Sequence, residues 1–163
     1  MYLAMIILLM GALPVASIAV EFAALHGGAD LLSLIGKWFV FWPVGVRLIL
    51  AGLRQVADPK FTAGTIFGVK DAAALTIVQE LGFGNLSIGT LGALSLVHRE
   101  WIVPAALTGG LFYGLAGIKH VLRSDRNAIE NIATVSDLFI FVVLAGYFTA
   151  VLFSADARAV TPN

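Results

Sequence analysis

The stretch TIVQELGFGNLSIGTLGALSL, residues Thr76–Leu96, decides how this chain folds. It is apolar and long enough to cross a bilayer as a helix, which needs about 20 residues. Yet it contains Gln79, Glu80 and Asn85 among four glycines. A charge in the middle of a membrane helix costs about 2.5–3.5 kcal/mol on insertion scales, so such a residue usually faces other helices and is paired. The stretch therefore predicts a helix that is packed inside a bundle.

The composition of the whole chain supports a membrane location. Of its 163 residues, 60% are hydrophobic and 12% are charged, and the mean hydropathy is +0.96. Soluble domains are about 25% charged. The ten Lys and Arg residues equal the ten Asp and Glu residues in number, so no charge excess suggests a nucleic-acid partner. The absence of cysteine excludes disulfides and thiolate metal sites.

The pattern predicts an all-α integral membrane helix bundle forming a single transmembrane domain over residues 1–163. About five spans are expected, a four-helix core plus an N-terminal span that is retained as an anchor. A short apolar piece at 61–69 is too short to span and is interpreted as interfacial or re-entrant. The predicted spans are about 1–25, 34–56, 72–97, 101–122 and 134–153, followed by a short polar tail at 154–163.

Positive charges predict the orientation of these spans. The side of the membrane that holds the N-terminus also holds the second and fourth connections, and it carries more Lys and Arg than the other side. Positive charge accumulates on the cytoplasmic side, so we expect the N-terminus inside the cell and the C-terminus outside. The residues compared are Arg54, Lys60, Lys70, Lys119, Arg123 and Arg126 against Lys37, Arg99 and Arg158.

Several polar residues are expected to meet inside the bundle, towards the cytoplasmic half. Counting about 1.5 Å per residue from the span ends places Arg47 and Glu80 at similar depths on adjacent antiparallel helices. We therefore predict that they form an ion pair, with either an architectural or a functional role. The predicted intramembrane polar cluster is Arg47, Glu80, Asn85, His120, Asn131 and Asp137.

The third span carries polar residues on two faces. At 100° per residue, Ser87 lies almost below Glu80, whereas Asn85 points about 140° away, on the side of Gly89 and Gly92. This predicts a central helix with neighbours on both sides. Its glycines would let other backbones approach closely.

Three residues form a possible metal set, although no metal site is predicted. Glu80, His120 and Asp137 offer carboxylate and imidazole ligands, which suit zinc, iron or manganese. His120 has other interpretations: a proton carrier, a hydrogen-bond donor to a quinone, or an interfacial histidine. Asp137 could simply favour the positive end of a helix dipole.

The order of these motifs resembles a family of small bacterial integral-membrane proteins of unknown function. The matching residues lie between about 40 and 150, in the runs QELGFGNLSIGTLGALSL, GLAGIKH and NAIENIATVSDLFI. The stretch RLILAGLRQVADPKF is also similar, more loosely, to DoxX-like membrane proteins, some of which are linked to quinone redox chemistry. The resemblance implies a shared set of motif residues: Glu80, Gly82, Phe83, Asn85, Gly117, His120, Asn131 and Asp137.

The functional hypothesis is a non-catalytic subunit or scaffold of a larger complex in the bacterial inner membrane. The expected partners are the lipid bilayer and other membrane subunits or further copies of the chain, which GxxxG spacing at Gly110 and Gly114 would suit. Two alternatives stay open. One is proton- or ion-linked transport through the Glu/Arg/His/Asp cluster, and the other is a quinone- or metal-linked redox component. No cofactor follows from the sequence, and the preferred hypothesis is not an enzyme.

Overall fold

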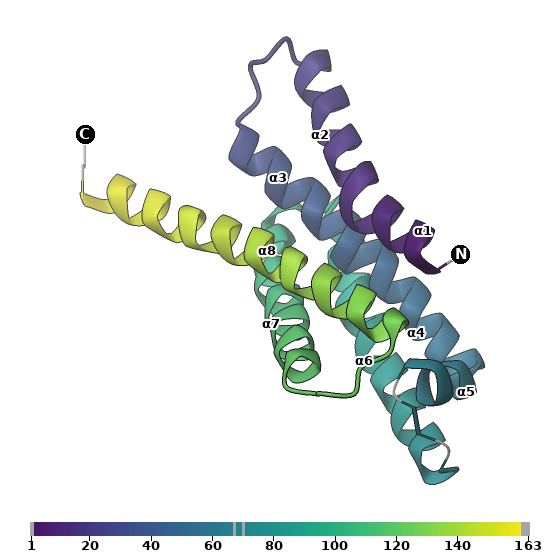
Figure 1. The fold of residues 1–163 in the computed structure, drawn as a ribbon. Helices are drawn as coiled ribbons and strands as arrows, with labels where there is room; N and C mark the ends of the chain where they lie inside the picture. Colours follow the sequence, from purple (N-terminus) through teal and green to yellow (C-terminus); the bar gives the residue numbers. More distant parts are fainter. Residues whose placement is uncertain (1, 67, 70, 161–163) are drawn as a thin grey trace.

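The chain folds as an all-α membrane helix bundle (Figure 1). The computed structural model describes residues 2–66, 68–69 and 71–160, and every element in this part of the chain is helical. Within it, four helices are long and apolar enough to cross a membrane: Tyr2–Ala24, Leu31–Ala57, Arg99–Val121 and Ala128–Ser154. The protein is therefore a multi-pass membrane protein.

The first two of these helices form an antiparallel pair. The first runs through α1 (Tyr2–Ile7), the π-turns of η1 (Leu8–Ala12) and α2 (Leu13–Ala24). The second runs through α3 (Leu31–Phe39), the π-turns of η2 (Val40–Arg47) and α4 (Leu48–Ala57). Between them the chain reverses at His26 and Gly27, both at positive φ. Asp30 then caps the start of α3, because its carboxylate accepts a hydrogen bond from the Ser33 N–H at 3.0 Å.

The third predicted span forms the helix α6 (Ala73–Leu94), which lies along η2 and α4. It is 22 residues long but is not among the four helices apolar enough to span on their own, because Gln79, Glu80 and Asn85 lower its hydropathy. Glycines bring the two backbones together. A Cβ on Gly92 would lie 2.7 Å from the Gly45 nitrogen, and one on Gly52 would lie 2.7 Å from the Gly82 carbonyl oxygen. The predicted packing face of α6 is thus confirmed.

The short apolar segment before α6 lies at one end of the bundle. It forms α5 (Pro59–Phe61) and η3 (Thr62–Ile66), in which Thr62 and Ala63 are buried. The Asn127 side chain, just before the last helix, donates a hydrogen bond to the Thr65 carbonyl at 2.9 Å. This contact places the segment beside the helix ends, as the interfacial alternative requires. Residues 67 and 70 fall outside the described part of the chain.

The last two helices, α7 (Ile102–Val121) and α8 (Ala128–Val160), pack against each other extensively (Figure 1). A single turn, η4 (Arg99–Trp101), leads into α7. The sequence predicts a last span of about 134–153, and the apolar span of α8 runs from Ala128 to Ser154, so it starts earlier and ends where expected. The helix begins at Ala128 because Asn127 caps it by accepting a hydrogen bond from the Glu130 N–H at 2.8 Å, and its helical backbone continues beyond the span to Val160. Residues 161–163 lie outside the described range.

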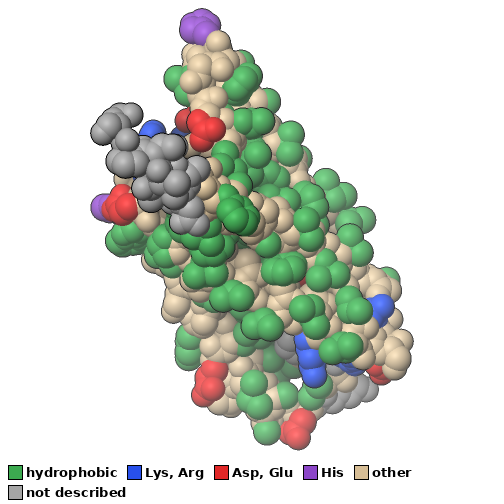
Figure 2. Space-filling view, turned by 90° about the vertical axis from the view of Figure 1, so that its left-hand side faces the viewer, with side chains coloured by type: hydrophobic (Ala, Val, Ile, Leu, Met, Phe, Trp, Pro, Cys, Tyr) green, Lys and Arg blue, Asp and Glu red, His purple; other side chains and the backbone are tan. Residues whose placement is uncertain are grey.

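An apolar core occupies the space between α3–η2–α4, α7 and α8. It includes Val40, Val44, Leu48 and Ile140, none of which is exposed to solvent. The outer surface is also largely apolar, as expected for lipid contact. In the face shown in Figure 2, hydrophobic side chains cover the middle, while acidic and basic side chains lie mainly towards the two ends.

The end of α7 is held by one arginine. The Arg126 Nη1 atom donates hydrogen bonds to three backbone carbonyls, those of His120 at 2.7 Å, Val121 at 2.8 Å and Arg123 at 2.6 Å. Its Nε atom also donates to the Asn131 side chain at 2.9 Å. These bonds tie the last turn of α7 to the chain that follows it and give the Val121 carbonyl a partner at the helix C-terminus.

We expect Arg126→Gln to weaken this end of the bundle by about 1–3 kcal/mol, because charge-assisted hydrogen bonds to several carbonyls are lost. Amide hydrogen exchange should become faster in the last turn of α7, while exchange in the middle of the helix should change little. Lys119→Gln, on the same turn but exposed, is the matched control. Equal exchange in both variants would show that Arg126 does not cap the helix.

Candidate functional site

A buried arginine, tyrosine and aspartate meet near the middle of the bundle. Arg47 comes from η2, Tyr113 from α7 and Asp137 from α8, and each lies within a few residues of the centre of its spanning helix. Arg47 Nη2 lies 3.5 Å from Asp137 Oδ1, and Arg47 Nη1 donates to the Tyr113 hydroxyl at 3.4 Å. Tyr113 is completely buried and donates in turn to the Pro43 carbonyl at 2.6 Å. We call Arg47, Tyr113 and Asp137 the inner triad.

The inner triad is paired by charge but is only partly hydrogen-bonded. Arg47 Nε and Asp137 Oδ1 are buried and form no hydrogen bond with any described residue. Its arginine–carboxylate contact, at 3.5 Å, is longer than the 2.7–2.9 Å of a well-formed charge-assisted bond. The charges therefore offset each other chiefly through electrostatic attraction in a dry environment, where attraction is stronger than in water.

A second polar layer lies between the inner triad and the end of the bundle. Glu130 is 1% exposed, although it lies in the first turn of α8. Its Oε1 atom lies 3.0 Å from His120 Nδ1 and accepts a hydrogen bond from Arg123 Nη1 at 3.4 Å. We call His120, Arg123 and Glu130 the outer layer. The outer layer lies beside the connection between α7 and α8. In this connection, a hydrogen bond from Arg123 holds the pKa of the exposed Asp125 carboxyl below its ordinary value.

The two layers follow from one spacing on two antiparallel helices. Tyr113 and His120 are seven residues apart on α7, and Glu130 and Asp137 are seven residues apart on α8. Seven residues are two helical turns, so each pair lies on one face of its helix with a rise of about 10 Å between layers. His120 meets Glu130 at the end of the helices, and Tyr113 consequently comes to the level of Asp137.

The polar layers end at the inner triad. Towards the opposite end of the bundle, the next buried positions in the described chain are the apolar Val40, Val44, Ile140 and Leu144, each 0–1% exposed. The Gly109 backbone packs directly against Val44, where an added Cβ would lie 2.5 Å from a valine methyl group. The described polar side chains thus occupy one half of the bundle interior and stop near its middle.

Glu80 is not part of this arrangement, and the predicted Arg47–Glu80 ion pair is wrong. Glu80 is exposed on the outer side of α6, and no described residue forms an ion pair or hydrogen bond with it. The depth estimate failed because α6 extends past the end of α4. Gln79 donates a hydrogen bond to the carbonyl of Val56 at 3.2 Å, and the two helices are antiparallel, so Glu80 lies level with Gln55 in the last turn of α4. Arg47 lies about 12 Å away along the helix axis, eight residues earlier.

The position of Glu80 near the end of α4 also explains how the membrane can accommodate its carboxylate. The helix Leu31–Ala57 has 27 residues and is therefore about 40 Å long, whereas the hydrocarbon core of a bilayer is about 30 Å thick. Its last residues extend into the headgroup region, and Glu80 lies there with them. The expected second working face of α6, with Glu80 and Ser87 directed towards Arg47, is not formed by this chain, because both residues are exposed.

The remaining predicted residues have separate partners. Asn85 is buried between α6 and α4, where its Nδ2 atom donates to the Gln55 side chain at 2.7 Å. Asn131 is exposed and accepts the hydrogen bond from Arg126 described above. His120 and Asp137 lie in successive layers of the site. Of the six predicted cluster residues, the two layers contain Arg47, His120 and Asp137.

The proposed metal ligands do not come together. Glu80 is on the outer face of α6, His120 is in the outer layer and Asp137 is in the inner triad. Among the described residues there is no group of three His, Cys, Asp or Glu side chains placed to hold a metal ion.

Sequence reasoning missed Tyr113 and Glu130, which belong to the site, and Gln55, which is the partner of Asn85. The sequence contained a signal for Tyr113 and Glu130. Tyr113 lies seven residues before His120, and Glu130 lies seven residues before Asp137, so each shares a helical face with a predicted site residue. Glu130 was hidden because an acidic residue in the first turn of a helix is ordinarily explained by the helix dipole. Gln55 gave no signal, because a glutamine near the end of a span is ordinarily a surface residue.

Comparison of the chain with protein-family models, with curated proteins and with solved structures found no match.

Proposed function

We propose that this protein is a non-catalytic subunit of a larger membrane assembly, and that the outer face of α6 is the surface that binds its partner. The observation that supports this is the character of that face. Small and polar residues are exposed along it, namely Thr76, Glu80, Gly84, Ser87 and Thr90, and they alternate with the exposed apolar residues Ile77, Phe83 and Leu94. A helix face in contact with lipid is normally apolar, whereas small and polar residues are typical of helix–helix interfaces in membranes.

The outward faces of α7 and α8 carry more large apolar side chains. On α7 the exposed residues include Leu107, Leu111, Leu115 and Ile118, and on α8 they include Val135 and Val142. These are ordinary lipid-facing side chains. Gly84 has no atom within 4 Å of an added Cβ, so a partner backbone can approach α6 closely at that point, beside the polar residues of this face.

The charge on this face favours a different protein over a second copy. In a two-fold symmetric dimer of parallel membrane helices, identical residues meet at the same depth. Two Glu80 carboxylates would then approach each other at the membrane edge, which is unfavourable. We infer a partner helix with small residues opposite Gly84 and Ser87 and a Lys or Arg near the level of Glu80.

The site in the bundle supports a structural role. Each buried charge has an opposite charge beside it: Arg47 lies beside Asp137, and Glu130 lies beside the partly exposed Arg123. We further propose that the protein lies in the bacterial inner membrane with its N-terminus in the cytoplasm, on the basis of the Lys and Arg distribution. The resemblance to small bacterial membrane proteins of unknown function also remains a proposal.

Gly84→Leu should remove the protein from its assembly without unfolding it. The leucine side chain would project from α6 into the space that a partner helix needs, while nothing in the chain itself lies there. Gly146→Leu on α8 is the matched control, because Gly146 is also exposed with no atom within 4 Å of an added Cβ. Extraction in native nanodiscs followed by size measurement should give a large species for the wild type and for Gly146→Leu, and a single chain for Gly84→Leu.

Substitutions at Glu80 test whether the partner carries a positive charge opposite this carboxylate. Glu80→Lys should release the partner, and Glu80→Gln should weaken the assembly less. A wild-type protein that runs as a single chain, or one affected equally by both glycine variants, would overturn the proposal. A species made only of two copies of this chain would overturn the choice of a different partner.

A further inference from the structure

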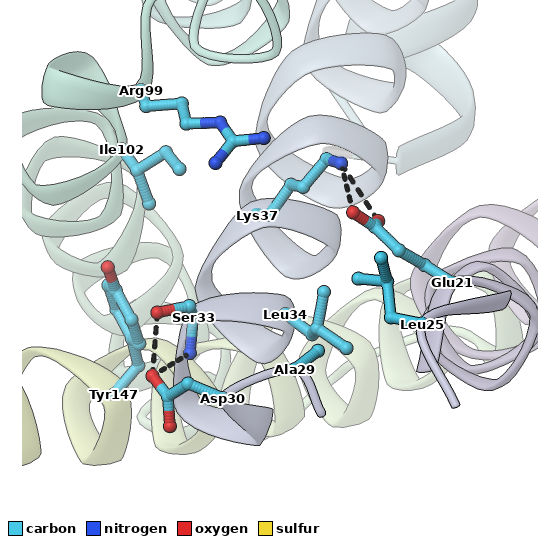
Figure 3. A pocket seen from close by; sticks show the side chains of 10 residues that line it. All are labelled: Glu21, Leu25, Ala29, Asp30, Ser33, Leu34, Lys37, Arg99, Ile102 and Tyr147. Carbon is cyan, nitrogen blue, oxygen red and sulfur yellow. Dashed lines mark hydrogen bonds and ion pairs between the residues drawn. The ribbon is translucent and has the colours of Figure 1, made fainter. Parts of the chain in front are cut away.

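A pocket of about 450 Å³ opens at the end of the bundle opposite the outer layer (Figure 3). It lies between the end of α2, the start of α3, the beginning of η4–α7 and Tyr147 on α8. Both cationic and anionic side chains line it, together with apolar ones. We propose that this pocket binds one phospholipid, whose phosphate is held by Arg99 and whose headgroup is zwitterionic, of the ethanolamine type.

Arg99 is the group in this pocket that is open to an anion. Its guanidinium extends from η4 towards Lys37 (Figure 3), and no described residue forms an ion pair or hydrogen bond with it. A guanidinium presents a planar fork of N–H donors that matches the oxygens of a phosphate. Lys37 supplies a second positive charge, although its Nζ atom is already bound by both oxygens of Glu21, at 2.8 Å each.

The acidic side chains of the pocket indicate the class of headgroup. Glu21 and Asp30 lie in the same lining as Lys37 and Arg99. A purely anionic headgroup would place its negative charge beside these two carboxylates as well as beside the two cations. An ethanolamine headgroup brings an ammonium together with the phosphate, and its N–H groups can donate to the carboxylate that Glu21 already presents to Lys37 and Trp38.

The depth of the pocket suits a lipid headgroup. Lys37 lies seven residues before the centre of its 27-residue helix, so it is about 10 Å from the middle of the membrane and a few Å inside the hydrocarbon edge. Asp30 lies another seven residues outward. Leu34 and Ile102 line the same pocket and give a lipid tail an apolar wall. The tryptophan Trp38 donates a hydrogen bond to Glu21 at 2.7 Å, as an anchor at the membrane interface would.

The test is native mass spectrometry of the full chain in detergent, titrated with phosphatidylethanolamine, phosphatidylcholine or phosphatidylglycerol. We expect one tightly bound phosphatidylethanolamine and weaker binding of the other two. Phosphatidylcholine cannot donate hydrogen bonds from its methylated ammonium. Arg99→Gln should weaken the binding of phosphatidylethanolamine about tenfold, the usual effect of losing a charge-assisted hydrogen bond.

Arg54→Gln is the matched control for this titration. Arg54 is an exposed arginine at the other end of the bundle, with its guanidinium 3.7 Å from the centre of the Phe61 ring. Its removal should leave lipid binding unchanged, and the thermal unfolding of both variants should match the wild type because neither residue is buried. Equal lipid binding by the two variants would overturn the site. Phosphatidylglycerol bound as tightly as phosphatidylethanolamine would overturn the headgroup, and displacement of the lipid by inorganic phosphate would show that free phosphate is the ligand.

Discussion

Asp137→Ala is expected to lower the free energy of unfolding by about 3–5 kcal/mol, because it leaves the buried Arg47 guanidinium without its counter-charge. Arg47 is 9% exposed and Asp137 is 5% exposed, so water cannot replace the lost partner without entering the bundle. The loss should appear as a large fall in the midpoint of thermal or denaturant unfolding of the protein in detergent. Glu80→Gln is the control, since an exposed carboxylate without a described partner should contribute within about 0.5 kcal/mol.

A double variant distinguishes the loss of the Arg47–Asp137 pair from the effect of leaving one charge without its partner. Replacing both Arg47 and Asp137 by apolar residues of similar volume, as in R47M/D137L, should recover much of the stability lost in Asp137→Ala, because no unpaired charge is left behind. If Asp137→Ala were no less stable than Glu80→Gln, the inner triad would not be a structural pair. If the double variant were less stable than Asp137→Ala, the hydrogen bonds of the triad would matter more than its charges.

Gly89→Ala is expected to destabilise the bundle by about 1–3 kcal/mol through overpacking. The new methyl group would lie 2.7 Å from the Ile49 backbone nitrogen and 2.8 Å from its Cγ1 atom, so α6 and α4 would have to separate. Moving a whole helix disturbs the other close contacts along it, including the buried bond from Asn85 to Gln55. The measurement is again the unfolding midpoint.

Gly84→Ala, on the same helix, is the control for this prediction. An added Cβ at Gly84 meets no atom within 4 Å, and alanine favours the helix by up to about 1 kcal/mol over glycine. Its stability should equal or exceed that of the wild type. Similar losses in the two alanine variants would mean that helix propensity, and not the contact between α6 and α4, determines the effect.

The packing of α6 was predictable because it depends on local spacing. Asn85, Gly89 and Gly92 lie on one side of a helix wherever that helix is placed, and small residues on one side indicate close packing. The polar pairs were not predictable in the same way. Pairing Arg47 with Glu80 required knowing how far α6 slides along α4, and no local feature of either helix contains that distance.

The sequence by itself determined that this is an all-α membrane protein, where most of its helices lie and which side of α6 is packed. These properties follow from hydropathy and from the 3.6-residue period, which act within one helix. Only the tertiary structure decided the partners of the buried charges. The turn at 122–127 sets the register of α7 and α8 and so brings Tyr113 level with Asp137, and Arg47 reaches both from η2. Glu80 remains outside because it lies near the end of α4, on the face of α6 that is exposed. Register between helices is a property of their contacts, and a sequence read helix by helix does not contain it.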